Sequence, residues 1–528
     1  MDYVIVGAGS AGCVLAARLS EDPDVQVTLL EAGPPDTSAL IHCPAGLAML
    51  AKYKRTNWAF QTVPQAGLGG RRGYQPRGKV LGGSSSINAM IYTRGVPQDY
   101  KAWAAEGNVG WDWDEVLPYF KRAEHNERGA DTWHGADGPL HVMDLSDPNP
   151  FSQAFVEAGV QAGHVHNPDF NGATQEGVGL YQVTHKGGER HSAAKAYLAP
   201  NMQRPNLRVI TDVHVTRVLL ENGRAVGVVY VQDGQEHTLQ VEREVILSAG
   251  AFQSPQLLML SGIGPADHLR QHGITVQHDL PGVGLHLHDH PDVIQIWDVP
   301  GARDLFGLSA GGLLRARKDL QRWREERRGP MTSNFAEAGG FIKSDPSEPV
   351  PDLQLHFVVG KLVDHGRATV FGHGFSCHVC VLRPRSRGSV RLASSNPLAA
   401  PLIDPAFLQS DDDMRRLVQG FKMMRDILQQ PALARHGGSE KSARVREDAE
   451  IEAYIRRHAD TIYHPVGSCR MGSGPLDVVN AKLAVHGVEG LRVVDASVMP
   501  HIIGGNTNAP VIMLAERVVG WIRKGQSH

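Results

Sequence analysis

The sequence predicts an α/β protein, α+β in part, in which a discontinuous Rossmann-like domain carries an inserted domain with a mixed sheet. Three observations support this fold class. A glycine-rich turn joins a strand pattern to a helix pattern at the start of the chain. Strand-like runs of the same kind return near residues 206–250 and again near residue 491. The intervening stretches mix strand and helix patterns of another kind.

The first element is a short apolar run over residues 2–6 (DYVIV), which its length and β-branched residues mark as a buried strand. The sequence GAGSAG over residues 7–12 follows, and an Ala/Leu-rich stretch from Cys13 to Leu19 predicts a helix. A second apolar strand over residues 26–30 ends at Glu31. These elements predict a βαβ unit.

The glycine pattern predicts a dinucleotide site. Gly7 permits the tight turn, Gly9 lets the backbone approach a pyrophosphate, and Gly12 lets helix and strand pack closely. The phosphate would then meet free N–H groups at the helix N-terminus. Glu31 ends the next strand and can accept hydrogen bonds from a ribose diol. The pattern alone does not separate NAD from FAD.

A second glycine- and serine-rich segment over residues 77–95 is expected to be a loop that runs into a helix. Gly82, Gly83, Ser84 and Ser85, followed by Asn88, would let a large flat ligand approach the main chain. The alternative is an ordinary helix-capping loop, since serine is a favoured N-cap residue. Residues 111–124 also favour a helix.

Strand patterns and helix patterns also alternate in the later part of the chain. Strands are expected at residues 207–211, 225–231, 244–250, 353–359, 375–382 and 491–497, and helices at 257–260, 414–428, 449–458 and 510–522. The order predicts a nucleotide-binding domain from residues 1–155, 201–290 and 461–528, and a second domain from residues 156–200 and 291–460.

Composition narrows the class of protein. Of 528 residues, 41% are hydrophobic, and the net charge of −3 provides no field for nucleic acid, so we expect no nucleic-acid partner. Five sparse cysteines do not form a disulfide framework and favour a reduced, cytoplasmic location. Cys377 and Cys380 fit opposite faces of a buried strand.

We expect no export signal and no transmembrane helix. We also expect no metal site, although His286, His288 and His290 surround Asp289.

Five long motifs, in order, resemble the glucose–methanol–choline oxidoreductase family. They are GAGSAG with LLEAG, RGKVLGGSSSINAM, GAFQSPQLLMLSGIG, YHPVGSCRMG, and LRVVDASVMP with NTNAP. The likeness spans nearly the whole chain and is greatest to bacterial primary alcohol dehydrogenases of the alkane-oxidation and choline dehydrogenase branch. It implies FAD, a discontinuous FAD-binding domain and a cap-like substrate-binding domain.

The resemblance implies a catalytic pair. His464 matches the family's active-site histidine, and Asn508 is assigned as its partner. An imidazole with a pKa near ~6.5 can take the alcohol proton at neutral pH, and an amide can hold the same oxygen without competing for the proton. The flavin N5 would accept the hydride. The product would be an aldehyde, with electrons passed to a quinone or another non-oxygen acceptor.

The resemblance also implies the cofactor contacts. They are Gly7, Gly9, Ser10, Ala11, Gly12, Glu31, Ala32, Val80, Gly83, Asn88, Ala89, Met90, Val215, Asp495 and Ala496. Some relatives attach FAD covalently through a histidine just before the loop asparagine. Ile87 stands there, so the sequence predicts dissociable FAD.

The substrate side leaves alternatives open. Ala336 stands where choline-oxidising relatives use an aromatic residue, which favours a neutral alcohol over choline. Tyr463 and His356 are substrate-side candidates, although His356 is equally well explained as a satisfied strand histidine. An oxygen-using oxidase, a choline dehydrogenase and a cyanohydrin lyase with structural FAD remain alternatives. Residues 313–328, with seven basic and three acidic residues, form either a solvated helix or a peripheral membrane surface.

Overall fold

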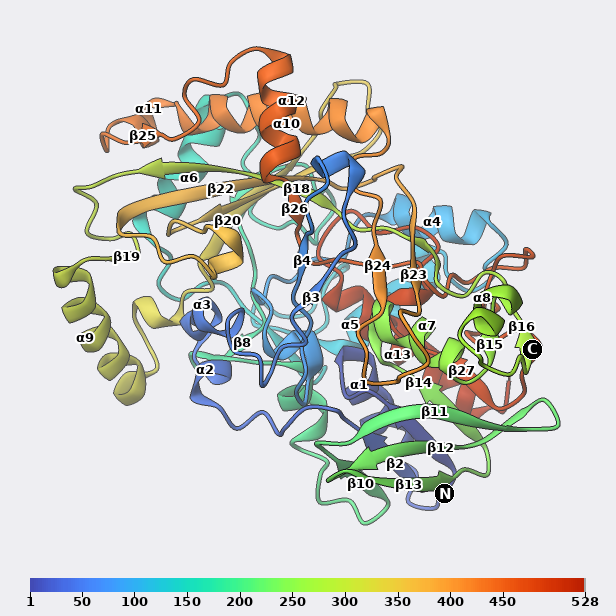
Figure 1. The fold of residues 1–528 in the computed structure, drawn as a ribbon. Helices are drawn as coiled ribbons and strands as arrows, with labels where there is room; N and C mark the ends of the chain where they lie inside the picture. Colours follow the sequence, from blue (N-terminus) through green and yellow to red (C-terminus); the bar gives the residue numbers. More distant parts are fainter. Residues whose placement is uncertain (527–528) are drawn as a thin grey trace.

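A computed structural model describes residues 1–526, and it contains two large sheets of different kinds. The first is a five-stranded parallel sheet with strand order β10-β2-β1-β14-β27. Its strands are β1 (Tyr3–Val6), β2 (Val27–Leu30), β10 (Leu207–Ile210), β14 (Glu244–Leu247) and β27 (Leu491–Val493). It therefore joins three distant parts of the chain, and in Figure 1 it lies at the lower right with both termini near it.

The parallel sheet is buried because helices pack around it, as the apolar composition of its strands requires. Helix α1 (Ser10–Leu19) follows β1 and packs against the C-terminal helix α13 (Asn508–Arg523). Helix α7 (Gly250–Leu260) follows β14. The carboxyl ends of β1 and β14 therefore both lead into helix N-termini.

The second sheet is antiparallel along its path, with order β25-β18-β22-β21-β20-β7. Its strands are β7 (Gly177–Leu180), β18 (Pro291–Asp298), β20 (Ala336–Ile342), β21 (Leu353–Val358), β22 (Gly372–Val381) and β25 (Ser439–Glu440). Helices α6 (Pro150–Gln161), α10 (Asp411–Leu428) and α12 (Asp448–His458) lie along its upper side in Figure 1. Cys377 and Cys380 of β22 belong to different hydrophobic clusters, as expected for opposite faces.

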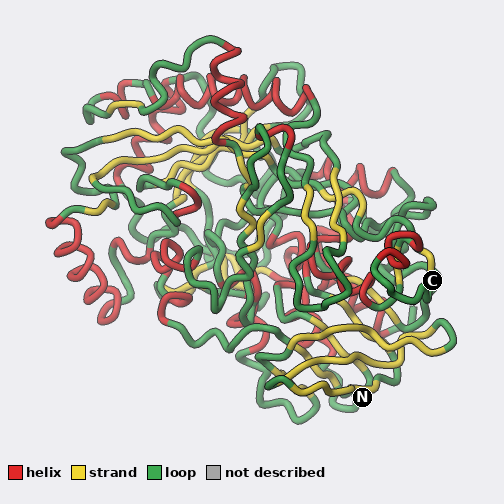
Figure 2. Tube along the Cα trace, viewed as in Figure 1, coloured by secondary structure: helices red, strands yellow, loops and turns green. Residues whose placement is uncertain are grey.

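Smaller elements connect these layers, and Figure 2 shows how much of the chain between the sheets is loop. The helices among them are α2 (Ala39–His42), α3 (Leu47–Leu50), α4 (Pro97–Ala105), α5 (Trp113–Ala123), α8 (Ala266–Gln271), α9 (Ala310–Glu326) and α11 (Pro431–Ala434). The main additional strands are β11 (His214–Glu221), β12 (Arg224–Gln232) and β13 (Gln235–Gln240), which form an antiparallel sheet. Within residues 1–526, no helix is both long and apolar enough to span a bilayer.

The predicted α/β class is confirmed, and so are the strands that begin at residues 244, 353 and 491. The prediction of a helix after the second glycine loop is wrong. Only a 3₁₀ turn, Gly83–Ser86, forms there. The guanidinium of Arg190 binds the carbonyls of Ser85 and Asn88, which a continuing helix would need for its own ladder. The domain boundaries stay predictions, and α6 crosses the one placed at residue 155.

Candidate functional site

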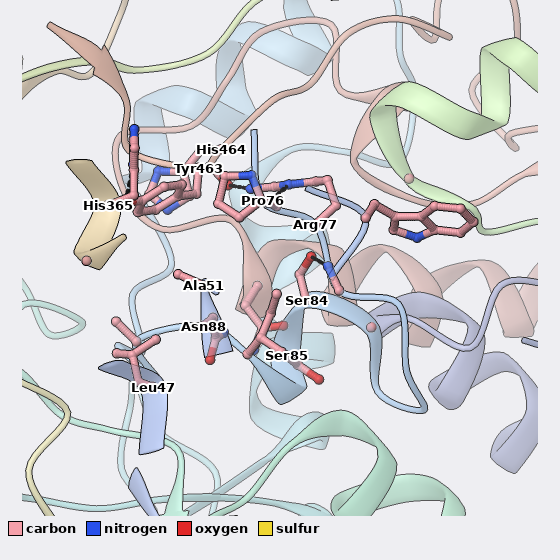
Figure 3. Close-up of a pocket in the computed structure, with 18 of the residues that line it drawn as sticks. Leu47, Ala51, Pro76, Arg77, Ser84, Ser85, Asn88, His365, Tyr463 and His464 are labelled. Carbon is pink, nitrogen blue, oxygen red and sulfur yellow. Dashed lines mark hydrogen bonds between the residues drawn. The ribbon is translucent and has the colours of Figure 1, made fainter. Parts of the chain in front are cut away.

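A cavity of about 670 Å³ extends from the carboxyl end of β1 to the face of β20 and β21. Both glycine loops, the segment around His464 and the start of α13 line it. Figure 3 shows His464, Tyr463 and Arg77 on one side of this pocket, and Asn88 and Ser85 across from them. The cavity therefore extends between the two large sheets.

The first glycine loop has the geometry that the sequence predicts. Gly7 has a φ of 99°, which disfavours any residue with a side chain. A Cβ atom on Gly12 would lie 1.9 Å from the carbonyl oxygen of Gly7, so helix and strand pack too closely for alanine. A Cβ atom on Gly83 would lie 2.6 Å from the Cα atom of Gly9, so the two glycine loops touch each other.

Glu31 lies in the cavity wall and is nearly fully buried. Its carboxylate accepts hydrogen bonds from the backbone N–H groups of Ala8 (2.9 Å) and Gly33 (2.8 Å). Burial nevertheless raises its pKa to about 7. Each carboxylate oxygen keeps a further lone pair, so Glu31 can still accept hydrogen bonds from a sugar diol.

Arg190 supports the second loop, and sequence reasoning missed it. Its buried guanidinium donates to the Asn88 carbonyl (2.7 Å) and to the Asn88 side-chain oxygen (2.8 Å). Desolvation lowers the pKa of Arg190 to about 9. No local pattern marks Arg190, because it lies 102 residues from Asn88.

Asp495 is held at the other side of the cavity, near the start of α7. Its carboxylate accepts from the Ser254 hydroxyl (2.5 Å) and from the backbone N–H groups of Gly250 (2.9 Å) and Ser497 (2.8 Å). Burial raises its pKa, whereas these three donors lower it. Ser254 therefore has a structural role, because its hydroxyl holds this carboxylate.

Most of the predicted cofactor residues line one continuous cavity. They are Gly7, Gly9, Ser10, Ala11, Glu31, Ala32, Gly83, Asn88, Ala89, Met90, Val215, Asp495 and Ala496. Gly12 and Val80 are not part of the lining. Gly12 packs α1 against β1, and Val80 lies in a small cluster with Ile41, Leu50 and Ile87.

His464 lies in the cavity wall and is almost completely buried. Its backbone N–H donates to Asp289 (2.9 Å), and its Nδ1 lies 3.1 Å from Nδ1 of His290. Desolvation and the neighbouring His290 and His356 hold the pKa of His464 well below its usual range. The imidazole is therefore neutral at physiological pH and can accept a proton.

The asparagine beside His464 is Asn506, whereas the sequence reasoning assigned Asn508. The Nδ2 atom of Asn506 lies 3.1 Å from Nε2 of His464. Asn508 instead begins α13, and its side-chain oxygen accepts from the hydroxyl of Ser10 (2.7 Å). Both asparagines occur in the same N-T-N motif. They lie two residues apart, and the folded chain places only Asn506 next to the histidine.

The two substrate-side candidates both line the cavity. The Tyr463 hydroxyl donates to Nδ1 of His365 (2.7 Å), whose Nε2 contacts Asp460 (3.1 Å). His356 is buried, and neither of its ring nitrogens has a hydrogen-bond partner within residues 1–526. A satisfied strand histidine would have such a partner, so His356 stays a substrate-side candidate, and desolvation lowers its pKa to about 3.

The walls beside His356 and His464 are mostly apolar. They include Ala89, Ile91, Phe335, Ala336, Val358, Leu362 and Ile462. No group of three or more histidine, cysteine or acidic side chains within the described chain is arranged to hold a metal ion.

The N-terminal βαβ unit has a glycine-rich turn, and a long cavity joins this turn to a buried neutral histidine. Together these features define a nucleotide-dependent oxidoreductase. Comparisons with known proteins identify the family. The chain matches the N-terminal and C-terminal parts of the family described as GMC oxidoreductase, over residues 1–292 and 384–515. It therefore belongs to the GMC oxidoreductases, whose cofactor is FAD.

Three relatives are similar to this protein over almost its whole length. An "Alcohol dehydrogenase (acceptor)" from Pseudomonas putida is 50% identical, covering 98% of this chain and 94% of its own. A mitochondrial choline dehydrogenase from Mus musculus is 45% identical, covering 99% and 89%. A solved FAD-dependent oxidoreductase from Chaetomium thermophilum superposes with a TM-score of 0.89 at 27% identity, covering 99% of each chain.

Proposed function

We propose that the protein oxidises a primary alcohol to an aldehyde and passes the electrons to a quinone or another non-oxygen acceptor. The observation that carries this proposal is the position of His464. It is neutral, buried and paired with Asn506, in the same cavity as the two glycine loops and Glu31. The family relationship and the alcohol dehydrogenase relative support the same reaction.

The side chains present can carry out the proton half of this reaction. His464 accepts the proton of the alcohol hydroxyl as a general base. Asn506 offers an amide N–H to the same oxygen and cannot itself take the proton. His356, whose two ring nitrogens have no partner within residues 1–526, is a further hydrogen-bonding group for the substrate. Bound FAD supplies the hydride acceptor.

The cavity fits FAD by its shape and its donors. The two glycine loops touch at Gly9 and Gly83, which allows the main chain to approach a flat, elongated ligand closely. The N-terminal residues of α1 line the cavity and offer free N–H groups to a phosphate. We propose that FAD is held without a covalent bond, because Ile87 stands before Asn88. Acid precipitation should then release all flavin into the supernatant.

Anaerobic mixing with alcohols tests the reaction. We expect a primary alkanol to bleach the bound flavin, and His464→Ala to slow this bleaching at least about 100-fold. A flavin that no alcohol reduces would contradict the proposal, as would near-normal reduction in the variant. Hydrogen peroxide formed at the rate of dye reduction would instead favour the oxygen-using alternative.

A neutral alcohol fits the cavity better than choline does. The walls near His356 and His464 are apolar, and Ala336 offers no ring to a quaternary ammonium. Tyr463 and Phe335 are the rings that remain in this part of the cavity, and the Tyr463 hydroxyl is bound to His365. A higher kcat/KM for an uncharged primary alkanol than for choline is expected, and the reverse order would identify a choline dehydrogenase. The lyase alternative has no support among the named relatives.

We further propose that a cytoplasmic form of the protein docks peripherally on the inner membrane, where quinones dissolve. The supporting observation is the surface around α9, which lies apart from the main body at the left of Figure 1. Leu313 and Leu314 of α9 are 62% and 68% exposed, and Phe371 nearby is 77% exposed. Leu308, Leu313 and Met49 are exposed and also line the cavity.

Basic side chains accompany these exposed apolar residues. Arg317, Lys318, Arg322 and Arg324 are exposed on α9, and such a surface suits anionic lipids. Co-sedimentation with vesicles containing anionic lipid should therefore be strong, and it should weaken in a Leu314→Ser, Phe371→Ser double variant, which changes two exposed residues outside the cavity lining. Reduction of flavin by a water-soluble alcohol should not change in that variant. Equal sedimentation of both proteins would contradict membrane docking.

A further inference from the structure

Two chains of hydrogen bonds end on the imidazole of His464, and each begins at a backbone carbonyl. A carbonyl oxygen can only accept a hydrogen bond, so it fixes the direction of every bond that follows it. The two chains approach His464 from opposite ring nitrogens. Together they determine which nitrogen of this histidine carries the proton.

The first chain runs through His290. Its Nε2 lies 3.0 Å from the carbonyl oxygen of Leu382, so Nε2 carries a proton and donates it. Burial lowers the pKa of His290 to about 3, so the ring is neutral and its Nδ1 has only a lone pair. This Nδ1 lies 3.1 Å from Nδ1 of His464. The His464 Nδ1 must therefore carry the proton.

The second chain runs through Tyr181, Gln354 and Asn506. The Tyr181 hydroxyl donates to the carbonyl of Leu355 (2.6 Å) and accepts from the Gln354 amide (3.2 Å). The same amide nitrogen donates to Oδ1 of Asn506 (3.1 Å). That bond orients Asn506 so that its Nδ2 faces Nε2 of His464 at 3.1 Å. The His464 Nε2 is therefore an acceptor.

The two chains agree with each other. The opposite tautomer of His464 would place the Nε2–H against an N–H of Asn506. It would also leave the Nδ1 lone pair of His464 against that of His290. The side chains of Tyr181, His290, Gln354 and His464 are buried and that of Asn506 is partly buried, and unmatched polar groups in such a place are costly.

We propose that His290 and Gln354 are positioning residues that hold His464 in its Nδ1–H tautomer, so that Nε2 keeps the lone pair that accepts from Asn506 until an alcohol hydroxyl takes the place of that amide. The inference rests on the proposed function, in which His464 takes the proton of the alcohol. His290 acts on the reaction only through His464, and Gln354 acts only through Asn506. Neither residue needs to touch the substrate.

The tautomer can be observed directly in the holoenzyme labelled with ¹⁵N-histidine. Long-range ¹H–¹⁵N correlation should show the His464 Nδ1 in the protonated range and Nε2 in the unprotonated range, with assignment by the loss of signals in His464→Ala. A wild-type His464 with its proton on Nε2 would overturn the proposal. That result would follow if His290 gave an Nδ1 proton to the Ile503 carbonyl, which also interacts with this ring.

Two substitutions at position 290 provide a matched comparison. His290→Asn places an amide oxygen near the original Nδ1 and can still accept from His464, whereas His290→Leu cannot. We expect His290→Leu to show mixed tautomers and to reduce flavin at least about 10-fold more slowly than His290→Asn, since a misplaced base loses part of its contribution. Equal rates and equal tautomer spectra would reject the role of His290.

Gln354→Met removes the donor that orients Asn506, with little change in volume. A weaker preference for the Nδ1–H tautomer is expected, together with slower flavin reduction at unchanged flavin content. An unchanged spectrum would reject the role of Gln354. The two proposals fail separately, because near-normal turnover of His464→Ala contradicts the alcohol-oxidation mechanism without changing the wild-type tautomer.

Discussion

At the scale of single residues, the environment of His464 determines its chemistry. The ring is desolvated and has His290, His356 and Arg77 as neighbours, all of which lower its pKa. A base with a depressed pKa stays neutral at pH 6.5 and above. The site is therefore ready to accept a proton throughout the physiological range.

This shift predicts the pH profile. The limiting rate of anaerobic flavin reduction should be flat above pH 6.5 and should fall only at lower pH, as His464 becomes protonated. Stopped-flow reduction across pH 5–9 measures it. An acidic limb with a midpoint at or above pH 6.5 would contradict the desolvated environment.

The two asparagines of the N-T-N motif should have separable effects. Asn506→Ala removes the amide next to His464, and we expect it to slow flavin reduction by about 10-fold or more, since buried polar partners contribute about 1–3 kcal/mol. Asn508→Ala removes the acceptor of Ser10 at the junction of α1 and α13 and should instead weaken FAD retention. The measurement compares the flavin reduction rate and the flavin content of the two variants. A larger loss of rate in Asn508→Ala than in Asn506→Ala would restore Asn508 as the partner of His464.

At the scale of elements, the site depends on how closely α1 packs on β1. The N-terminal end of α1 lines the cavity, and its position is fixed by the contact between Gly12 and Gly7. A shift of this helix would move the N–H groups that are expected to hold a phosphate. Sheet, helix and cofactor site are therefore coupled through one residue without a side chain.

A pair of glycine substitutions tests this coupling. Gly12→Ala places a Cβ atom 1.9 Å from the Gly7 carbonyl oxygen, so it should lower the melting temperature and the flavin content. Gly520→Ala, within α13, meets nothing within 4 Å and should stabilise the helix by about 1 kcal/mol. A Gly12→Ala protein with normal stability and full flavin would contradict the packing argument.

At the scale of the whole molecule, a buried polar network joins segments that are far apart in the chain. His134 contacts Glu124 (3.2 Å) and Asp169 (2.9 Å), and Glu124 also pairs with the buried Arg94. The two carboxylates raise the pKa of His134 to about 9 although burial opposes this. The charged imidazole therefore stabilises the assembled fold.

The sign of the pH effect follows from this raised pKa. The folded state holds the proton more tightly than the unfolded chain does, so the contribution is complete below about pH 6.5. It is lost as the pH rises through about 9. His134→Gln should lower the melting temperature at pH 6.5 and should make its decline between pH 6.5 and 9 shallower. Parallel pH curves for wild type and variant would contradict this role.

The sequence predicted much of the fold because its signals are local. The glycine turn, the strand over residues 3–6 and the helix after it depend on neighbours within a few residues. The 77–95 segment was mispredicted because Arg190, about a hundred residues away, takes the carbonyls that a helix would use. Local propensity could not reveal that competitor.

By itself, the sequence determined the βαβ start, the glycine loops and the family, and it made His464 the candidate base, since each of these signals lies in contiguous residues. Only the tertiary structure decided that Asn506 rather than Asn508 meets His464, and that His290 and Gln354 orient this pair. The physical reason is that a hydrogen bond depends on the direction of a side chain. Two positions in one motif can point to different neighbours, and only the folded chain brings those neighbours within reach.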